Sequence, residues 1–213
     1  MSNRKRYKLL SATGNAHKVQ EMKAILADYP LELVSLAELG LNVPPPEESG
    51  GNYLENALIK ARYYAQASGL PCLADDSGLE IKALDGAPGL YSHRFLNECR
   101  TQAEKNACVL KLLKEEKDRY AQFRCVCVIY GLKRLGVENA EDYLTSEAIC
   151  PGEIAQQASG SSGFGYDPIF LLPERACCMA DLTEKEKNAV SHRGQAVRQT
   201  AEKLLKLLGD KQA

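Results

Sequence analysis

The sequence predicts an α/β protein with a mixed central sheet flanked by helices. Early in the chain, strand-like apolar segments alternate with segments whose apolar residues recur at helical spacing. Later, two consecutive strand-like segments, 123–132 and 142–150, are typical of a long antiparallel pair. Parallel and antiparallel neighbours in one sheet make it mixed. The length of 213 residues suits a single domain spanning 1–213.

The first half of the chain alternates strands and helices. Val19, Met22 and Ile25 recur at helical spacing directly after a break at Gly14-Asn15. Three prolines and two glycines between residues 42 and 52 predict a loop. The predicted segments are a strand over 7–12, a helix reaching residue 26, a strand over 31–36, that loop, and a helix over 54–65.

The second half contains more strands. Asp75-Asp76-Ser77-Gly78 has the composition of a turn, so two short strands, 70–74 and 79–83, are expected on either side, with the carboxylates at a strand end. Thr183 and Glu186 have the spacing of a capping box at a helix start. The other predicted segments are a helix over 101–117, a glycine-rich loop over 159–165, a strand over 169–172, and a C-terminal amphipathic helix from Val197 to Leu208 closed by Gly209.

Composition and charge exclude several classes of protein. With 27 Lys and Arg against 28 Asp and Glu, the chain has no global positive field to attract nucleic acid, so an anionic partner must meet a local pocket. The longest apolar stretch, 125–132, is too short to cross a membrane. The basic start leads into polar residues and not into an apolar leader segment. We therefore expect a cytoplasmic protein with no membrane or nucleic-acid partner.

Eight cysteines suggest a disulfide scaffold or a metal site, but their spacing supports neither. No CxxC pair occurs, and a chain of this size without a secretory leader needs no disulfides. Cys125 and Cys127 alternate in a strand-like segment, where small buried side chains fit. We expect reduced thiols.

A strand, a turn and a helix start meet at residues 13–18. Backbone N–H groups at a helix N-terminus attract anions, and Lys18 adds a full positive charge. The alternative is a plain turn in which Asn15 caps the helix. The candidate phosphate contacts are Thr13, Gly14, Asn15, Ala16, His17 and Lys18.

Two acidic pairs are candidates for holding one divalent cation. Glu47-Glu48 lies in the predicted loop between residues 42 and 52, and Asp75-Asp76 follows an apolar segment. Mg²⁺ prefers sparse carboxylate coordination completed by water and substrate phosphates. Solvated carboxylates are the alternative, which is favoured for Glu47, whereas burying Asp75-Asp76 would be costly without a cation.

Two further clusters are candidate binding sites, and the first of them suits a flat ligand. Glycines flank Phe164 and Tyr166 in the loop before Asp167, so the backbone can approach a base and Phe164 can stack on it; a tight loop with aromatic plugs is the alternative. Lys187 and the segment 191–194 form the second cluster. The alternative is that these residues are a charged face exposed to solvent, with no binding role.

Seven motifs together resemble the inosine triphosphatase, or Ham1-like, family of purine nucleoside triphosphate pyrophosphatases. They follow the family's order and span nearly the whole chain. His93 and Phe95 depart from residues often found in the family, at positions given no chemical role. The motifs are TGNxxK at 13–18, EESG at 47–50, ENAxxKA at 55–61, ADDSGL at 74–79, GAPGxYS at 86–92, GFGYDPIF at 163–170 and SHRG at 191–194.

The resemblance implies hydrolysis of ITP, dITP and XTP to the monophosphate and pyrophosphate with Mg²⁺, which removes deaminated purines from the nucleotide pool. It also implies two lobes around a nucleotide cleft, as in the Maf/Ham1 group, and a homodimer. It implies that Glu48 and Asp76 hold the metal, that Asp76 accepts a proton from water and that Asp75 supports it; one sequence cannot decide between Glu47 and Glu48. Lys60 completes the catalytic set, and the remaining substrate contacts are Ser77, Phe164, Gly165, Tyr166, Asp167, Lys187, His192 and Arg193.

The expected base selection follows from hydrogen-bond edges. A 6-keto purine accepts at O6 and donates at N1, whereas adenine offers a donor amino group and an acceptor. Arg193 and His192 can donate to O6, and Asp167 can accept from a donor edge. Each group left unpaired by adenine costs about 1–3 kcal/mol. Rejection of guanine is not explained in this way.

Three rival functions fit the sequence less well. A Maf-like pyrophosphatase for pyrimidine or modified nucleotides lacks support from the SHRG and GFGYD motifs. A non-enzymatic nucleotide sensor would not need the intact Asp75-Asp76 and Lys60. A thiol-based redox or metal protein would need cysteine spacings that this chain does not have.

Overall fold

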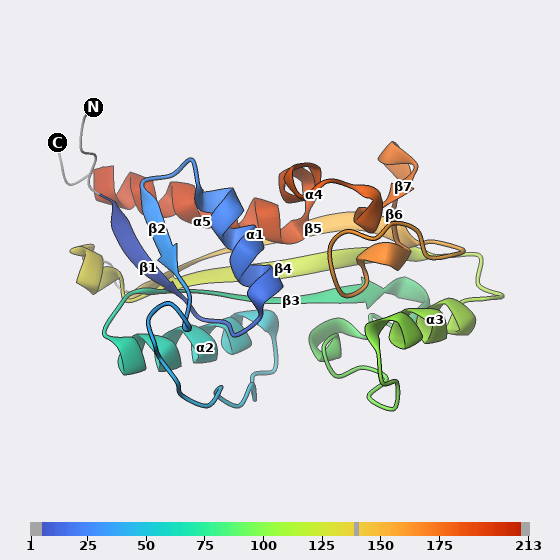
Figure 1. Ribbon diagram of the computed structural model, residues 1–213, viewed down its shortest axis with the longest axis horizontal. Helices are drawn as coiled ribbons and strands as arrows, with labels where there is room; N and C mark the ends of the chain where they lie inside the picture. The colour runs from blue at the N-terminus through green and yellow to red at the C-terminus, as the bar shows by residue number, and fades with distance from the viewer. Residues whose placement is uncertain (1–5, 139–140, 210–213) are drawn as a thin grey trace. The chain divides into compact units, whose positions relative to one another are not determined.

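The computed structural model describes residues 6–138 and 141–209 (Figure 1). Over these residues the strands form one seven-stranded sheet in the order β2-β1-β3-β4-β5-β6-β7. The bounds of the strands are β1 Tyr7–Ser11, β2 Leu31–Val34, β3 Cys72–Ile81, β4 Tyr120–Tyr130, β5 Tyr143–Ile154, β6 Phe170–Leu172 and β7 Cys177–Cys178. Those of the α-helices are α1 Ala16–Leu26, α2 Tyr53–Ser68, α3 Gln102–Leu112, α4 Glu184–Val190 and α5 His192–Gly209.

The predicted mixed sheet is confirmed. Strand β1 pairs in parallel with both β2 and β3, whereas β6 pairs antiparallel with β5 and β7. The Gly131 N–H donates to the Asp142 carbonyl, and the Ile154 N–H donates to the Arg119 carbonyl. These bonds join opposite ends of β4 and β5, so the two strands run antiparallel, as the sequence predicts.

Residue contacts divide the chain into two units, each of which is described by itself. Unit 1 comprises residues 1–76, 125–148 and 193–213, and unit 2 comprises 77–124 and 149–192. Strands β3, β4 and β5 contribute residues to both units. A single domain over 1–213 and a nucleotide cleft between two lobes remain predictions.

In unit 1, helices cover both faces of the strands. Figure 1 shows α1 and α5 on one face and α2 on the other. Alternate residues of β4, such as Cys125 and Cys127, are fully buried and belong to the same apolar cluster as Met22 of α1 and Leu204 of α5. The prediction that these cysteines are small buried side chains is confirmed, and all eight cysteines are free thiols.

Unit 2 has its own apolar core. Residues of β3, β4 and β5 contribute to it, together with the buried side chains of α3 and the segment 166–182. The rings of Phe123 and Phe170 lie 4.5 Å apart at its centre. Among the residues that the structure describes, no helix is both long and apolar enough to cross a membrane.

The expected turn at Asp75-Asp76-Ser77-Gly78 is wrong. Strand β3 runs without interruption through these residues, so both carboxylates lie in the middle of a strand and not at its end. Asp75 and Asp76 are 1% and 8% exposed. The turn composition is overridden because the strand is paired and both side chains meet buried positive charges.

Several helix ends match their predicted signals. Thr183 and Glu186 form the expected capping box at α4, and Thr101 and Glu104 form another at α3. Helix α3 ends at Leu112, short of the expected residue 117, while α5 begins earlier than expected, at His192. End positions are the least determined part of a helix pattern.

Two glycines with nearly equal φ separate backbone strain from steric conflict. Gly160 (φ +81°) and Gly86 (φ +85°) both lie in the left-handed region. A Cβ at Gly160 would meet the Ala180 carbonyl carbon at 2.2 Å, whereas one at Gly86 would meet nothing within 4 Å. We expect Gly86→Ala to cost about 1–2 kcal/mol from φ strain alone, and Gly160→Ala to cost about 1–3 kcal/mol more from overpacking. Urea unfolding of both variants measures the difference, and equal losses would contradict the steric argument.

Candidate active site

Asp75 lies at the centre of a buried cluster of charges in unit 1. Lys18 of α1 places its Nζ 2.9 Å from Asp75 Oδ2, and Arg193 of α5 places its Nε 3.1 Å from the same oxygen. The Arg193 Nη1 also lies 2.7 Å from Glu21 Oε2. Arg193, Glu21 and Asp75 are all buried. Two helices and the central strand are thus joined by charge-assisted hydrogen bonds.

These contacts fix the protonation of the cluster. Burial by itself raises the pKa of Asp75. The positive charges of Lys18, Arg193 and Lys60 lower it by more than burial raises it, so the net pKa lies well below the ordinary value. Burial lowers the pKa of Arg193, and Asp75 and Glu21 raise it beyond that loss. Asp75 is therefore a carboxylate and Arg193 a cation.

Asp76 belongs to a second cluster, around Lys60 of α2. The Lys60 Nζ lies 2.8 Å from Asp76 Oδ1 and 3.1 Å from Glu48 Oε2. Asn56, one helical turn before Lys60, donates from Nδ2 to Asp76 Oδ2 at 3.3 Å. Both oxygens of Asp76 therefore have a donor from the same face of α2.

The pKa of Asp76 is shifted in the opposite direction to that of Asp75. Burial raises the pKa of Asp76, and although Lys60 opposes this, the net pKa is raised. Burial lowers the pKa of Lys60, but the carboxylates of Asp76, Asp75 and Glu48 raise it overall. A carboxylate with a raised pKa is a stronger proton acceptor than an ordinary one.

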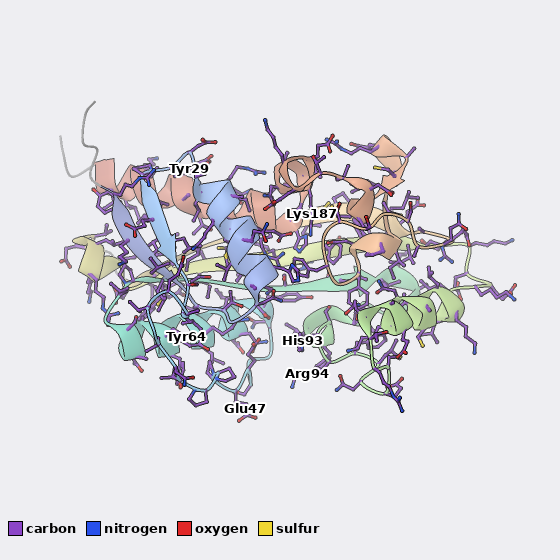
Figure 2. All side chains as sticks on the ribbon, in the orientation of Figure 1. Tyr29, Glu47, Tyr64, His93, Arg94 and Lys187 are labelled. Carbon is purple, nitrogen blue, oxygen red and sulfur yellow. The ribbon has the colours of Figure 1, made fainter. Side chains whose placement is uncertain are left out.

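A bond to α2 positions the loop that carries Glu48. The Gly50 N–H donates to Asn56 Oδ1 at 2.8 Å, and a Cβ at Gly50 would lie 2.7 Å from that same oxygen. Glycine is therefore required for this close approach. Glu47 is exposed, and Figure 2 shows its side chain at the outer edge of the loop. Of the two glutamates, Glu48 is the one placed beside Lys60 and, through it, Asp76.

The carboxylates around Lys60 fit a cation. Oxygens of Glu48 and Asp76 both lie within 3.1 Å of one ammonium nitrogen, so they already converge on a single positive charge. Within residues 6–138 and 141–209 no group of three or more His, Cys, Asp or Glu side chains is close enough to form a metal cage. A sparse set of this kind suits Mg²⁺, which keeps several waters and substrate oxygens as ligands.

The turn at residues 13–18 is a capped helix start. Asn15 Oδ1 accepts from the N–H groups of His17 (3.0 Å) and Lys18 (3.3 Å), and Thr13 Oγ1 accepts from the Asn15 N–H. The structure therefore contains the Asn15 cap that was the alternative interpretation, and the Asn15 side chain occupies the amides of His17 and Lys18. Phosphate contacts at residues 13–18 stay a prediction. The Lys18 side chain points to Asp75.

In unit 2, the predicted aromatic loop closes around Asp167. The buried carboxylate accepts from the Phe164 N–H at 2.7 Å and from Lys187 Nζ at 2.5 Å. Lys187 Nζ also lies 4.5 Å from the centroid of the half-buried Phe164 ring, within the range of a cation–π contact. A Cβ at Gly163 (φ +73°) would meet the Asp167 carboxylate at 2.2 Å, so this position requires glycine.

The remaining predicted contacts in unit 2 are mostly buried. The Tyr166 hydroxyl donates to the Ser92 carbonyl at 3.0 Å. His192 stacks on Phe123 with ring centroids 4.6 Å apart and an interplanar angle of 11°. Ser77, the residue of β3 after Asp76, is half-buried. The structure thus brings Phe164, Asp167 and Lys187 together, whereas His192 packs on the core of this unit.

Sequence reasoning missed three residues of these clusters. Asn56 was recognisable only as part of a polar stripe with Lys60 on an otherwise apolar helix. Glu21 carries a charge on the buried face of α1, next to Met22, and is 6% exposed. Asn106, buried in α3, donates to the Gly165 carbonyl at 3.0 Å; no local pattern pointed to it.

The chain is similar to known proteins over most of its length. A sequence profile of the Ham1 family matches residues 9–203. A dITP/XTP pyrophosphatase of Photorhabdus laumondii is 46% identical over 195 residues, which cover 90% of this chain and 94% of that protein. A dITP/XTP pyrophosphatase of Escherichia coli O157:H7 is 44% identical over 193 residues, with the same coverage.

Two solved structures have the same fold. The HAM1 protein from Coxiella burnetii superposes with a TM-score of 0.80 at 41% identity, covering 94% of this chain and 99% of that one. The Staphylococcus aureus Ham1 protein gives a TM-score of 0.74 at 32% identity, covering 97% of this chain and all of that one. The family resemblance and the α/β fold class predicted from the sequence are confirmed.

The Asp75 cluster predicts a specific dependence of stability on pH. Because its folded pKa is lowered, Asp75 contributes stability that is fully present above the unfolded pKa of about 3.9 and is lost as pH falls toward the folded pKa. Asp75→Asn leaves Arg193 and Lys18 short of one carboxylate, so we expect a loss of about 3–5 kcal/mol at pH 7. The difference from wild type should shrink below about pH 4.

Urea unfolding at pH 7 and pH 3 measures both effects. The exposed Glu47, changed to Gln, is the matched control and should alter stability by less than about 0.5 kcal/mol. A difference between wild type and Asp75→Asn that is the same at both pH values would contradict the ionised, cation-bound state of Asp75.

Proposed function

Because the chain belongs to the Ham1 family, we propose that it is a nucleoside triphosphate pyrophosphatase that cleaves between the α and β phosphates of ITP, dITP and XTP. The products are the monophosphate and pyrophosphate, the reaction depends on Mg²⁺, and it removes deaminated purines from the nucleotide pool. The carrying observation is the pair Asp75-Asp76, buried side by side yet held in different protonation environments by Lys18, Arg193 and Lys60.

Glu48 and Asp76 are the residues that would hold the metal, since their oxygens already converge on one cation. Mg²⁺ bound there supplies positive charge that stabilises the phosphate oxygens as negative charge develops on them. Asp75 adds a third carboxylate, which the neighbouring Lys18 and Arg193 hold in its ionised form.

Asp76 is the proton acceptor for the attacking water. Its raised pKa and its place beside Lys60 suit a group that takes up a proton and then returns it. Asn56 holds its second oxygen, so the carboxylate is oriented before substrate arrives. Lys60 balances the negative charge of the Asp76 carboxylate.

The phosphates are bound from unit 1. Lys18 and Lys60 supply positive charge, and the residues from Thr13 to Lys18 supply a tight turn at the start of α1. Ser77 adds a hydroxyl next to Asp76. Since Asn15 caps two of the helix amides, the positive side chains are the main attraction for the phosphates.

The base is bound from unit 2. Phe164 stacks on the ring, Asp167 accepts from a donor edge, and Lys187 forms an ion pair with that carboxylate and adds a donor for O6. His192, Gly165 and Tyr166 shape this loop and its surroundings. A homodimer, the absence of nucleic-acid partners and a cytoplasmic location stay part of this proposal.

The surroundings of Arg193 change the role that we propose for it. The sequence favours donation from Arg193 to O6 of the base, but the guanidinium is 3% exposed and bonded to Asp75 and Glu21. Those bonds favour a role for Arg193 in holding Asp75 in position.

The products and the substrate range test the reaction class. We expect ITP, dITP and XTP to be hydrolysed far faster than ATP or pyrimidine nucleotides, because the base contacts suit a 6-keto purine, and far faster than GTP, as the family resemblance implies. This turnover should require a divalent cation. Ion-exchange separation of the products should show monophosphate and pyrophosphate. Release of orthophosphate, or preferred turnover of pyrimidine nucleotides, would overturn the proposal.

The role of Asp76 is tested against a neighbouring carboxylate. Asp76→Asn keeps the shape of the side chain but removes its basicity and a metal ligand, so kcat should fall by about 10²–10⁴-fold. Glu47→Gln should leave turnover near wild type, because Glu47 is exposed and Glu48 is the glutamate that contacts Lys60. Near-normal kcat of Asp76→Asn at saturating Mg²⁺ would exclude Asp76 as the base.

The revised role of Arg193 predicts a loss that is independent of the base. Arg193→Ala should lower kcat/KM by about tenfold to a thousandfold for ITP, and by a similar factor for the slow ATP reaction, because Asp75 loses its position. Phe164→Ala is the comparison, since it acts on base binding. A loss confined to ITP would instead support donation to O6.

A further inference from the structure

Cys99 and Cys108 form a pair of thiols that the proposed reaction does not use. Their Sγ atoms lie 3.5 Å apart, in mutual van der Waals and hydrogen-bond contact. Both side chains are half-buried, whereas Cys72, Cys125, Cys127, Cys150 and Cys178 are buried. The pair is therefore accessible to small reagents, and each thiol is in place to react with a neighbour bound to the other.

The pair joins a rigid element to an irregular one. Cys108 lies in α3, whose start is fixed by a complete capping box. Cys99 lies in the segment 92–100, which has no helix or strand and contains Leu96 at φ +52°. A disulfide needs an S–S distance near 2.05 Å, about 1.5 Å less than the present separation. We expect the irregular segment, and not α3, to move by this distance.

Both sides of the pair support the loop that surrounds Asp167. On one side, the Ser92 carbonyl at the start of the irregular segment accepts from the Tyr166 hydroxyl. On the other side, Asn106, two residues before Cys108, donates to the Gly165 carbonyl. A covalent bond between Cys99 and Cys108 would thus link the two supports of residues 163–167 to each other.

We propose that Cys99 and Cys108 are a reversible redox site that forms an intrachain disulfide by exchange with a small uncharged disulfide. In the first step one thiolate attacks the reagent, forms a mixed disulfide and releases one reagent thiolate, which takes up the cysteine's proton. In the second step the other thiolate attacks the sulfur of the bound cysteine, and the second reagent thiol leaves. Two cysteine thiols are oxidised and one reagent disulfide is reduced to two thiols.

The groups around Cys99 determine which reagents can react with the pair and how fast they do so. The hydrogen bond to Cys108 raises the pKa of Cys99 to about 11, and burial and the nearby carboxylates of Glu98 and Glu104 contribute in the same direction. Because the thiolate is the reactive form, the first step is slow near neutral pH. The same carboxylates repel anionic reagents, which favours an uncharged one. The second step is fast because the two sulfurs are already in contact.

The experiment uses the full reduced chain under native conditions with 2-hydroxyethyl disulfide. After the remaining thiols are blocked with N-ethylmaleimide, mass spectrometry should show that Cys99 and Cys108 carry neither the blocking group nor retained reagent. Trypsin cleaves after Arg100 and Lys105, so residues 95–100 and 106–111 should appear as one cross-linked peptide. Dithiothreitol should restore both thiols.

Matched variants identify the pair. Cys177 is the remaining half-buried thiol, and Cys177→Ser should form the same cross-link between Cys99 and Cys108 as wild type does. Cys99→Ser and Cys108→Ser should each keep one 2-hydroxyethylthio group, which is half of the reagent, as a stable mixed disulfide on the remaining thiol of the pair, because the second attack is lost. Near-ultraviolet circular dichroism checks that both variants fold. Reagent retained on both Cys99 and Cys108 of the wild-type chain, or a cross-link that involves Cys177 instead, would overturn the proposal.

Hydrogen exchange tests the link to the loop supports without reference to activity. Oxidation should slow exchange in residues 92–100 and leave α3 unchanged, because the irregular segment is the side that moves and becomes tethered. The same treatment of the Cys99→Ser variant should produce no such slowing. Unchanged exchange in residues 92–100 of a fully oxidised wild-type chain would contradict the assigned movement.

Discussion

Two adjacent carboxylates buried in the middle of β3 impose the main constraint on unit 1. Successive side chains of a strand point to opposite faces, so Asp75 and Asp76 take their direct ion-pair partners from different faces. Each face must supply its own: Lys18 and Arg193 come from α1 and α5 on one side, and Lys60 comes from α2 on the other (Figure 1). A buried charge without a partner costs several kcal/mol, so the placement of these three helices is tied to the two carboxylates.

This arrangement gives the two neighbours different chemistry. Asp75 has two cations on one oxygen and is ionised, while the pKa of Asp76 is raised by burial that Lys60 and Lys18 do not fully offset. One carboxylate is thus fixed as a charge and the other is able to exchange a proton. The difference arises from which face of the strand each occupies and not from the residue type.

Unit 2 solves a similar problem with a loop in place of helices. Asp167 is buried beside Lys187, and its carboxylate reaches back to the Phe164 amide across a position where any Cβ would collide with it. The glycines of this segment therefore allow a carboxylate and an aromatic ring to lie against one lysine. Ser92 and Asn106 hold the neighbouring residues from outside the loop, which makes the conformation of the loop depend on elements distant in sequence.

Local signals in the sequence were enough for the elements whose pattern is local. Helical spacing predicted α1, α2 and α3, capping residues predicted the start of α4, and the motifs from Thr13 to Gly194 identified the family and placed Asp75, Asp76 and Lys60 among its candidate residues. The sequence misjudged Asp75-Asp76-Ser77-Gly78, whose turn composition is overridden by strand pairing and by lysines and an arginine from elsewhere in the chain. The partnership of Arg193 with Glu21, 172 residues away, and the hold of Asn56 on Asp76 were decided only by tertiary structure. Which charges neutralise each other depends on the faces that the strand and helices turn toward one another, and no spacing along the chain encodes that.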